Sequence, residues 1–132
     1  MGQPAAKEGD QVTAVDIHIV MVPSGIGPVP TPLPHNFSGV INGKLSSDVK
    51  IMGSAAATKG STAENTPAHI PTPPGVSFQS PPSNMATIET ASQTVKINGK
   101  GAARAGDSAF TCNDPTDLLN GTVVAGGTVL IG

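Results

Sequence analysis

Apolar and polar residues alternate along much of the chain, and this pattern predicts β-structure. Residues 11–22 place Val or Ile at nearly every second position, as expected for a strand with one buried face. Shorter runs of the same kind predict further strands at residues 40–43, 48–52 and 87–97, and two short Val-rich runs within residues 118–131. The pattern therefore predicts a mostly β fold of short strands.

A single short segment predicts a helix. Residues Thr116–Leu119 follow Asp114-Pro115, where the Asp can cap a helix and the Pro can occupy its first position. The rest of the chain shows no amphipathic helical period, so one turn is the most helix we expect.

Two Pro-rich arms interrupt the strand pattern. Residues 23–34 hold five prolines, at positions 23, 28, 30, 32 and 34, and a second arm spans 67–74 and 81–82. Proline lacks the backbone N–H that helices and central strands need, so we expect both arms to be extended and to lie outside any central strand.

An Ala-Ala motif recurs three times within the same short frame. The three Ala-Ala frames are QPAAKEGD at 3–10, SAAATKGS at 54–61 and KGAARAGD at 100–107. They are closed by Gly9, Gly60 and Gly106, at offsets of 51 and 46 residues. Asp10 and Asp107 hold the same place in their frames, which favours a turn-capping role. Three copies of one unit predict internal repeats around an approximate three-fold axis.

The composition narrows the class of protein. A chain of 132 residues is expected to form one domain, and its 2% aromatic content leaves the core without large rings, so a metal or a partner would add stability. A net charge of -2, with no Lys/Arg run, argues against a nucleic-acid partner. No apolar stretch reaches membrane-span length, and the start lacks the apolar region of a signal peptide. We expect a protein made in the cytosol, with any export by another route.

Two of the three histidines and the single cysteine lie at similar distances after the ends of the repeated frames. His18 and His69 each lie eight residues after the ends of their frames, Asp10 and Ser61, and Cys112 lies five residues after Asp107. Units wrapped around one axis would bring these three side chains together. His35, in the first Pro-rich arm, would be the fourth ligand, and Ser83 stands at the matching place in the second arm.

These four residues, His18, His35, His69 and Cys112, form a complete tetrahedral zinc set. Taken singly, each is more often a hydrogen-bonded His or a buried Cys, but the shared phase favours a metal. Thiolate and imidazole ligands favour zinc over magnesium or calcium, with iron as a weaker alternative. Four protein ligands leave no open position, so the expected zinc is structural, one per chain.

Other catalytic motifs are missing from the sequence. It contains neither the G-x-S-x-G nucleophile elbow nor the G-x-x-x-x-G-K-[ST] phosphate loop. The sequence therefore predicts a non-enzymatic protein. The alternatives are a small zinc-dependent hydrolase, which would need one ligand to be dispensable, and an adaptor that carries other proteins.

The Ala-Ala frames resemble the motif of the PAAR-repeat family. The first frame contains Pro4-Ala5-Ala6-Lys7, the second Ala55-Ala56-Ala57-Thr58 and the third Gly101-Ala102-Ala103-Arg104. The resemblance covers nearly the whole chain through the three-fold recurrence, the Gly-Asp endings and the inventory of three His and one Cys. It implies a small cone-shaped β domain with a zinc near its apex, held by His18, His35, His69 and Cys112.

The resemblance also implies a role and partners. Members sit on the spike of contractile injection machines, such as type VI secretion systems and phage-tail-like particles, and sharpen it for membrane puncture. We therefore expect one chain to cap a trimeric spike of the VgrG type, with transient contact to the target membrane and with effectors as further partners. The chain ends about 20 residues after Cys112, so a built-in effector is not expected.

Overall fold

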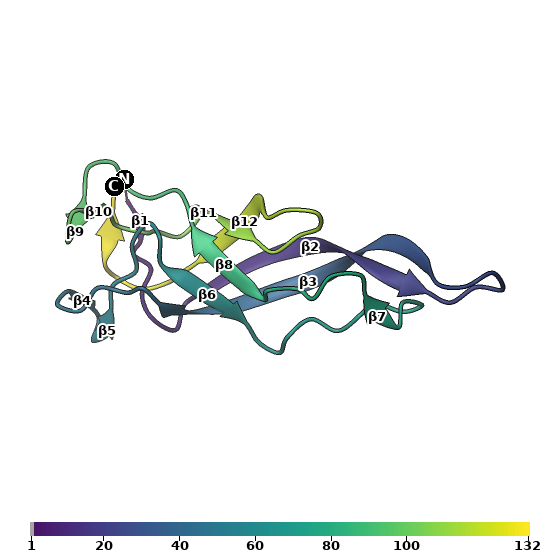
Figure 1. Ribbon diagram of the computed structural model, residues 1–132. Coiled ribbons are helices and arrows are strands. Elements are labelled where there is room, and N and C mark those ends of the chain that lie inside the picture. The colour runs from purple at the N-terminus through teal and green to yellow at the C-terminus, as the bar shows by residue number, and fades with distance from the viewer. Residues whose placement is uncertain (1) are drawn as a thin grey trace.

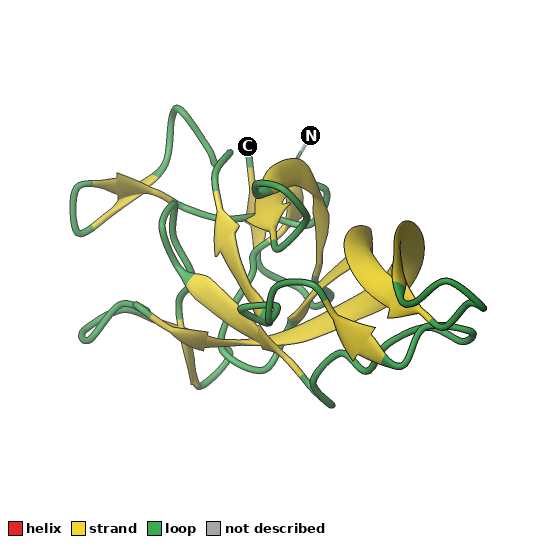
Figure 2. Cartoon of the chain, turned by 45° about the vertical axis from the view of Figure 1, so that its right-hand side comes forward, coloured by secondary structure: helices red, strands yellow, loops and turns green. Residues whose placement is uncertain are grey.

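The computed structural model describes residues 2–132, which form thirteen β-strands and no helix (Figure 2). The strands are β1 (Gln3–Pro4), β2 (Gln11–Val22), β3 (Val29–Gly43), β4 (Lys50–Ile51), β5 (Ser54–Ala55), β6 (Thr62–Asn65), β7 (Ser77–Phe78), β8 (Met85–Ile88), β9 (Lys96–Ile97), β10 (Lys100–Gly101), β11 (Ser108–Thr111), β12 (Leu118–Val124) and β13 (Leu130–Ile131). Accordingly, residues 2–132 include no helix that could span a membrane.

Six strands close into an antiparallel barrel. Three strand pairs, β2–β3, β6–β8 and β11–β12, each come from one repeat. Each pair joins the next through β3–β6 and β8–β11, and β12 returns to β2. Closure through the last pairing leaves the barrel without a free strand edge. The three-copy sequence is therefore folded as three neighbouring hairpins of one closed sheet.

The Ala-Ala frames hold one another in a ring of equivalent backbone hydrogen bonds. The N–H of Ala6 donates to the carbonyl of Ala103 (2.9 Å), Ala103 donates to Ala57 (3.0 Å), and Ala57 donates to Ala6 (3.1 Å). Three antiparallel bridges follow the same cycle and join Ala5 to Arg104, Ala56 to Lys7 and Ala102 to Thr58. Each frame thus makes the same contacts with its two neighbours.

Each frame ends in the same tight turn. Gly9, Gly60 and Gly106 have φ angles of 94°, 93° and 89°, a region that favours glycine because it has no Cβ. Oδ2 of Asp10 accepts the N–H of Lys7 (3.0 Å), and Oδ2 of Asp107 accepts that of Arg104 (2.7 Å). The predicted turn-capping role of these two aspartates is confirmed.

Small side chains fill the interior, which suits a narrow barrel. The main cluster is rich in alanine and is completed by a few larger side chains: Ala6, Val12, Phe37, Ile41, Ala57, Ala63, Ala86, Ile88, Ala103, Ala109, Cys112 and Val123. A second cluster lies on the other side of the ring and combines Ala5, Ala56 and Ala102 with Ile51, Ile97 and Ile131. Each frame therefore contributes one alanine to each cluster.

Three short two-stranded sheets lie at one end of the barrel, on the left in Figure 1. They are β4–β5, β9–β10 and β1–β13, and each contributes one of the three buried isoleucines. Positive φ angles at Met52 and Asn98, each followed by a glycine, turn the first two sheets back on themselves. These three sheets are called the base hairpins below, although β1 and β13 come from opposite ends of the chain.

The other end of the molecule is a long two-stranded ribbon. Beyond the barrel, residues 14–22 of β2 and 29–37 of β3 continue to pair, and β7 adds to β2 at Val20 and Met21 (Figure 1). This part is called the distal ribbon. Pro30, Pro32 and Pro34 alternate along β3, so the positions without an N–H face the outer edge of the ladder. The predicted extended conformation is confirmed for residues 29–34.

Other sequence predictions have mixed outcomes. The strand predicted at 11–22 is confirmed as β2. The segment 87–97 was predicted as one strand, but β8 ends at Ile88 and β9 begins at Lys96. A loop separates them because β8 belongs to the barrel and β9 to a base hairpin.

The helix predicted at Thr116–Leu119 is wrong. Asp114 does not cap a helix, because its N–H donates to the carbonyl of Ile17 (2.8 Å) and its Oδ2 accepts the N–H of Ile19 (2.8 Å). Leu118 instead begins β12, which pairs with β11 and β2. Tertiary hydrogen bonding has overridden a local capping signal.

Candidate metal centre

The alternation of β2 and β3 aims three polar side chains into the molecule just beyond the barrel. Asp16 and His18 are two residues apart on the buried face of β2, and both are fully buried. His35 lies opposite Asp16 in the β2–β3 register and is also buried. Asp16 and His18 therefore reach the same space for the same reason, the two-residue period of a strand.

His69 is delivered by a loop after β6. Its N–H donates to Oδ1 of Asn84 (2.8 Å), and the amide of Asn65 donates to the same oxygen (3.2 Å). Asn65 also accepts the N–H of Ser38 through its Oδ1 (2.9 Å), which ties the loop to β3. These bonds hold a segment without regular structure, so the backbone of His69 is tied to β3 and to the loop before β8.

Cys112 directly follows β11, and the next two residues fasten it to β2. Oδ1 of Asn113 accepts the N–H of Ile17 (2.7 Å), and Asp114 bonds to the backbone of Ile17 and Ile19. The side chains of Asn113 and Asp114 thus continue the hydrogen bonding along β2 past the residues that pair with β12. As a result the thiol lies beside Asp16 and His18.

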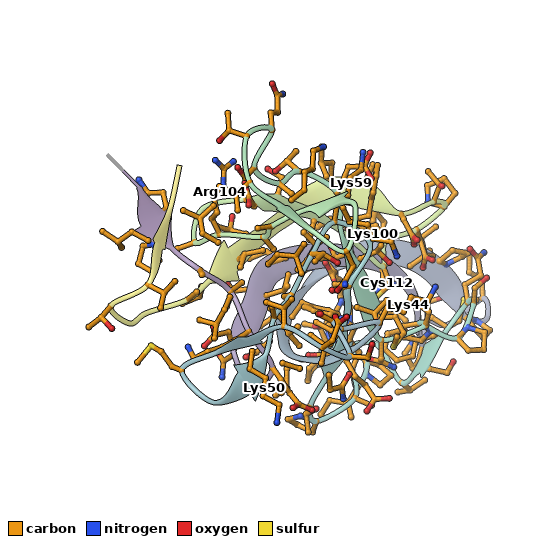
Figure 3. The ribbon with its side chains drawn as sticks, turned by 90° about the vertical axis from the view of Figure 1, so that its left-hand side faces the viewer. Lys44, Lys50, Lys59, Lys100, Arg104 and Cys112 are labelled. Atoms are coloured by element: carbon orange, nitrogen blue, oxygen red, sulfur yellow. The ribbon has the colours of Figure 1, made fainter. Side chains whose placement is uncertain are left out.

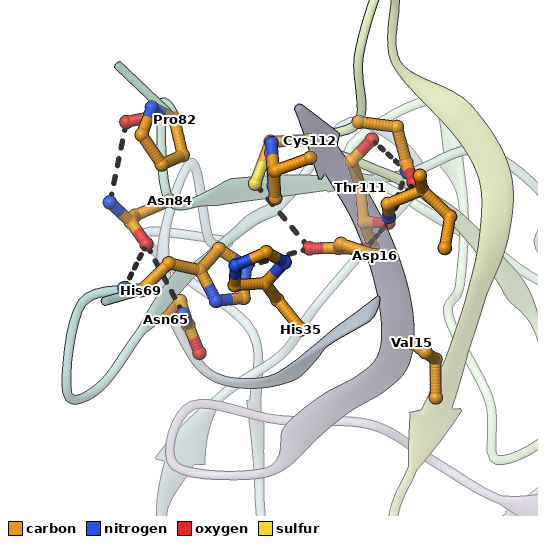
Figure 4. A network of polar contacts seen from close by, with 12 residues as sticks. Val15, Asp16, His35, Asn65, His69, Pro82, Asn84, Thr111 and Cys112 are labelled. Carbon is orange, nitrogen blue, oxygen red and sulfur yellow. Dashed lines mark hydrogen bonds and ion pairs between the residues drawn. The ribbon is translucent and has the colours of Figure 1, made fainter. Parts of the chain in front are cut away.

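Four of these side chains bring possible ligand atoms together. The carboxylate of Asp16, the imidazoles of His18 and His69 and the thiol of Cys112 each offer one atom, all within 4.8 Å of one another. Oδ2 of Asp16 accepts from Nε2 of His69 (3.0 Å) and from Sγ of Cys112 (3.4 Å), as Figure 4 shows. The hydroxyl of Thr111 donates to the other carboxylate oxygen, which holds Asp16 in place.

Neither ring nitrogen of His18 has a hydrogen-bond partner within residues 2–132. Its side chain is fully buried, yet among the described residues neither Nδ1 nor Nε2 is hydrogen-bonded. Nδ1 lies 3.5 Å from Oδ2 of Asp114 without making a hydrogen bond. Because an unpaired buried polar atom is costly, this ring fits a group that accepts a lone pair, such as a metal ion. The donors of the cluster therefore suit a metal.

His35 lies beside this cluster but directs its nitrogens elsewhere. Its Nδ1 is 2.9 Å from the carbonyl of Leu33, and its Nε2 accepts the N–H of Thr72 (3.1 Å). Its ring centroid is 5.4 Å from that of His18 and 5.5 Å from that of His69. The ring packs against the cluster while both nitrogens are engaged with backbone.

Burial changes the acid–base behaviour of the cluster. It lowers the pKa of His18 and of His35, which favours the neutral imidazoles that bind metals. It raises the pKa of the Cys112 thiol to about 11, with the charge of Asp16 adding to the rise. In the metal-free protein the thiol is therefore protonated at neutral pH, and binding a metal as thiolate must release that proton.

The structure brings together three of the four ligands expected from the sequence, namely His18, His69 and Cys112. Asp16, which was not expected from the sequence, joins them, and His35 lies beside the cluster with both ring nitrogens engaged by backbone. The signal was present, because Asp16 lies two residues from His18 in a strand that was correctly predicted. The cluster could hold a metal ion.

No protein-family model matches the chain, and no curated protein matches it either. The resemblance to PAAR repeats therefore depends on the residues quoted above.

Proposed function

We propose that this protein is a structural tip that caps a trimeric spike of a contractile injection machine. The closed ring of Ala6, Ala57 and Ala103 is the observation that carries the proposal. A single chain with three equivalent frames can meet three equivalent chains of a partner, which a chain without internal repetition cannot do.

The base hairpins offer matching surfaces for such a partner. Each of the three carries large apolar side chains that are exposed, including Met52, Val95 and Leu130. The two-stranded sheets are also short and have free edges. Exposed apolar side chains beside open edges are typical of surfaces that bind another chain by strand addition and apolar burial. One such surface per repeat supports docking onto a three-fold partner.

The proposed metal is zinc, held by His18, His69 and Cys112 with Asp16 as the fourth ligand. Thiolate with imidazole favours zinc, and four protein donors make a closed, structural site. His35 would support the site by packing and through its own backbone bonds. The ion would join β2, the loop after β6 and the end of β11, one element from each repeat, where the barrel opens into the distal ribbon.

A hydrolytic role is less well supported. A cavity of about 580 Å³ borders His35 and His69, so a small molecule could approach the rings. However, the residues lining this cavity include no carboxylate that could act as a base. Asp16 is fully buried, and its carboxylate oxygens accept hydrogen bonds from Thr111, Cys112 and His69. We therefore propose a non-catalytic metal.

Mixing the purified protein with a trimeric VgrG-type spike tests the proposal. We expect one chain per trimer by mass measurement of the isolated complex. Leu130→Asp, on an exposed base side chain, should weaken the complex, while Val124→Asp, on an exposed barrel side chain, should not. A complex with three chains per trimer, or a Leu130→Asp variant that binds normally, would contradict the proposed docking.

A further inference from the structure

Charge is strongly segregated along the molecule. Residues 17–43 and 65–88 contain no Lys, Arg, Asp or Glu. They include the outer part of the distal ribbon, the turn at its end and the loops that carry β7 (Figure 1). All seven Lys and Arg residues belong to the frames, to the base hairpins or to the loop after β3: Lys7, Lys44, Lys50, Lys59, Lys96, Lys100 and Arg104. Figure 3, viewed from the base end, shows five of them.

The uncharged end also exposes large apolar side chains. Ile26, in the turn between β2 and β3, is 96% exposed, and Val76, just before β7, is 67% exposed. The N–H of Val76 donates to the carbonyl of Met21 (3.0 Å), which places this residue beside the end of β2. Val29 pairs with Val22 at the same end and is itself exposed. Apolar side chains from two separate segments thus gather where charge is absent.

The outer edge of the distal ribbon is poor in hydrogen-bond donors. Pro30, Pro32 and Pro34 occupy the edge-facing positions of β3, where an ordinary strand would present N–H groups. An edge without donors is a poor template for a partner strand, which argues against strand addition at this site. It also removes groups that would otherwise have to be dehydrated in an apolar environment.

We propose that the distal end of the ribbon inserts into the interface of an electrically neutral lipid bilayer. Transfer of the exposed apolar side chains from water into the bilayer is favourable, and this end of the ribbon has no charged group whose transfer would oppose it. Because this end carries no Lys or Arg, anionic headgroups are not needed for binding. The edge carbonyls still require water, so the ribbon enters the interface and does not span the bilayer. This inference rests on the proposed function, since a chain that caps a spike through its base hairpins leaves the distal ribbon as the end that meets a target membrane.

Flotation with phosphatidylcholine vesicles tests the inference on the 132-residue protein loaded with zinc. The protein should float with the vesicles, and the bound fraction should be the same at low and high salt. In the double variant Ile26→Asp, Val76→Asp the fraction of protein bound to vesicles should fall by roughly tenfold or more, because a carboxylate is strongly disfavoured in a bilayer. Both side chains are exposed, so this variant should keep its fold and its metal. Val124→Asp, on the barrel, is the matched control and should float normally.

Three outcomes would overturn the inference: no flotation of the unaltered protein, flotation that requires anionic lipid, or normal flotation of the double variant. Spike binding is measured in parallel. A protein that binds the trimeric spike but does not float refutes the lipid contact alone. A protein that floats but binds no spike refutes the proposed docking alone.

Discussion

Nε2 of His69 lies 3.0 Å from Oδ2 of Asp16, although the two residues are 53 positions apart. The same carboxylate oxygen accepts a hydrogen bond from the thiol of Cys112, so a single buried oxygen contacts one side chain from each of the other two repeats. The contact joins strand β2 to the loop after β6 and to the end of β11. It follows that Asp16 has a central place in the cluster, which separates it from His35.

The variant pair Asp16→Asn and His35→Gln should separate the roles of these two residues. If Asp16 is the fourth ligand, the substitution Asp16→Asn should lower the affinity for zinc by roughly a hundredfold or more, since it removes a charged ligand. His35→Gln should reduce it less, by about tenfold, because His35 acts through packing and backbone bonds. Competition with a chromophoric chelator measures both values. The opposite order would assign the fourth ligand to His35.

Cys112→Ser should lower metal affinity and thermal stability together. The thiolate is the strongest zinc donor in the cluster, and structural zinc contributes on the order of 10 kcal/mol to folding. If even about 3 kcal/mol of this is lost, the melting temperature should fall by roughly 10 °C in a domain of this size. Calorimetry with and without a chelator measures the change. An unaltered melting temperature in the variant would rule out a structural metal at Cys112.

The metal-free protein should become less stable in mild acid. Burial lowers the pKa of His18 and His35 below 6.5, so below that pH the unfolded chain binds more protons than the folded one. The stability of the folded protein is therefore unaffected by the titration of these two rings above pH 6.5. It falls as the pH is lowered from 6.5 through their lower folded-state pKa values. Urea unfolding of the chelated protein across this range measures the slope. Stability that rises on acidification would contradict the burial of these rings as neutral groups.

The frame recurrence and the strand alternation could be used to predict much of this fold. Residues 11–22 form the strand that their pattern indicates, and the Gly residues that close the frames form matching turns. These features could be predicted because both depend on local backbone geometry. The repeat also explains why His18, His69 and Cys112 meet, since each follows its own frame at a similar distance.

Other features depend on contacts that a local pattern does not contain. Asp114 and Pro115 look like a helix start, but Asp114 is used by the backbone of Ile17 and Ile19, nearly a hundred residues earlier in the chain. The prediction of His35 as a ligand came from its residue type, from its place in the first Pro-rich arm and from the resemblance to PAAR repeats. Its nitrogens are engaged by Leu33 and Thr72, and the position of Thr72 depends on the packing of the second Pro-rich arm.

The ring of alanines should tolerate no enlargement. Ala57 is fully buried and bonded to both neighbouring frames, so Ala57→Val should cost about 1–3 kcal/mol through overpacking. Ala68→Val, at an exposed position, is the matched control and should change stability by less than about 0.5 kcal/mol. Chemical denaturation gives both values. Equal stability of the two variants would show that the ring is not closely packed.

The stoichiometry of the complex with a trimeric spike tests the central claim most directly. Native mass spectrometry of the purified complex should give one chain of this protein for three spike chains, because its three frames form one closed ring. Three chains per trimer, or no complex with any trimeric spike from the same cell, would contradict the account.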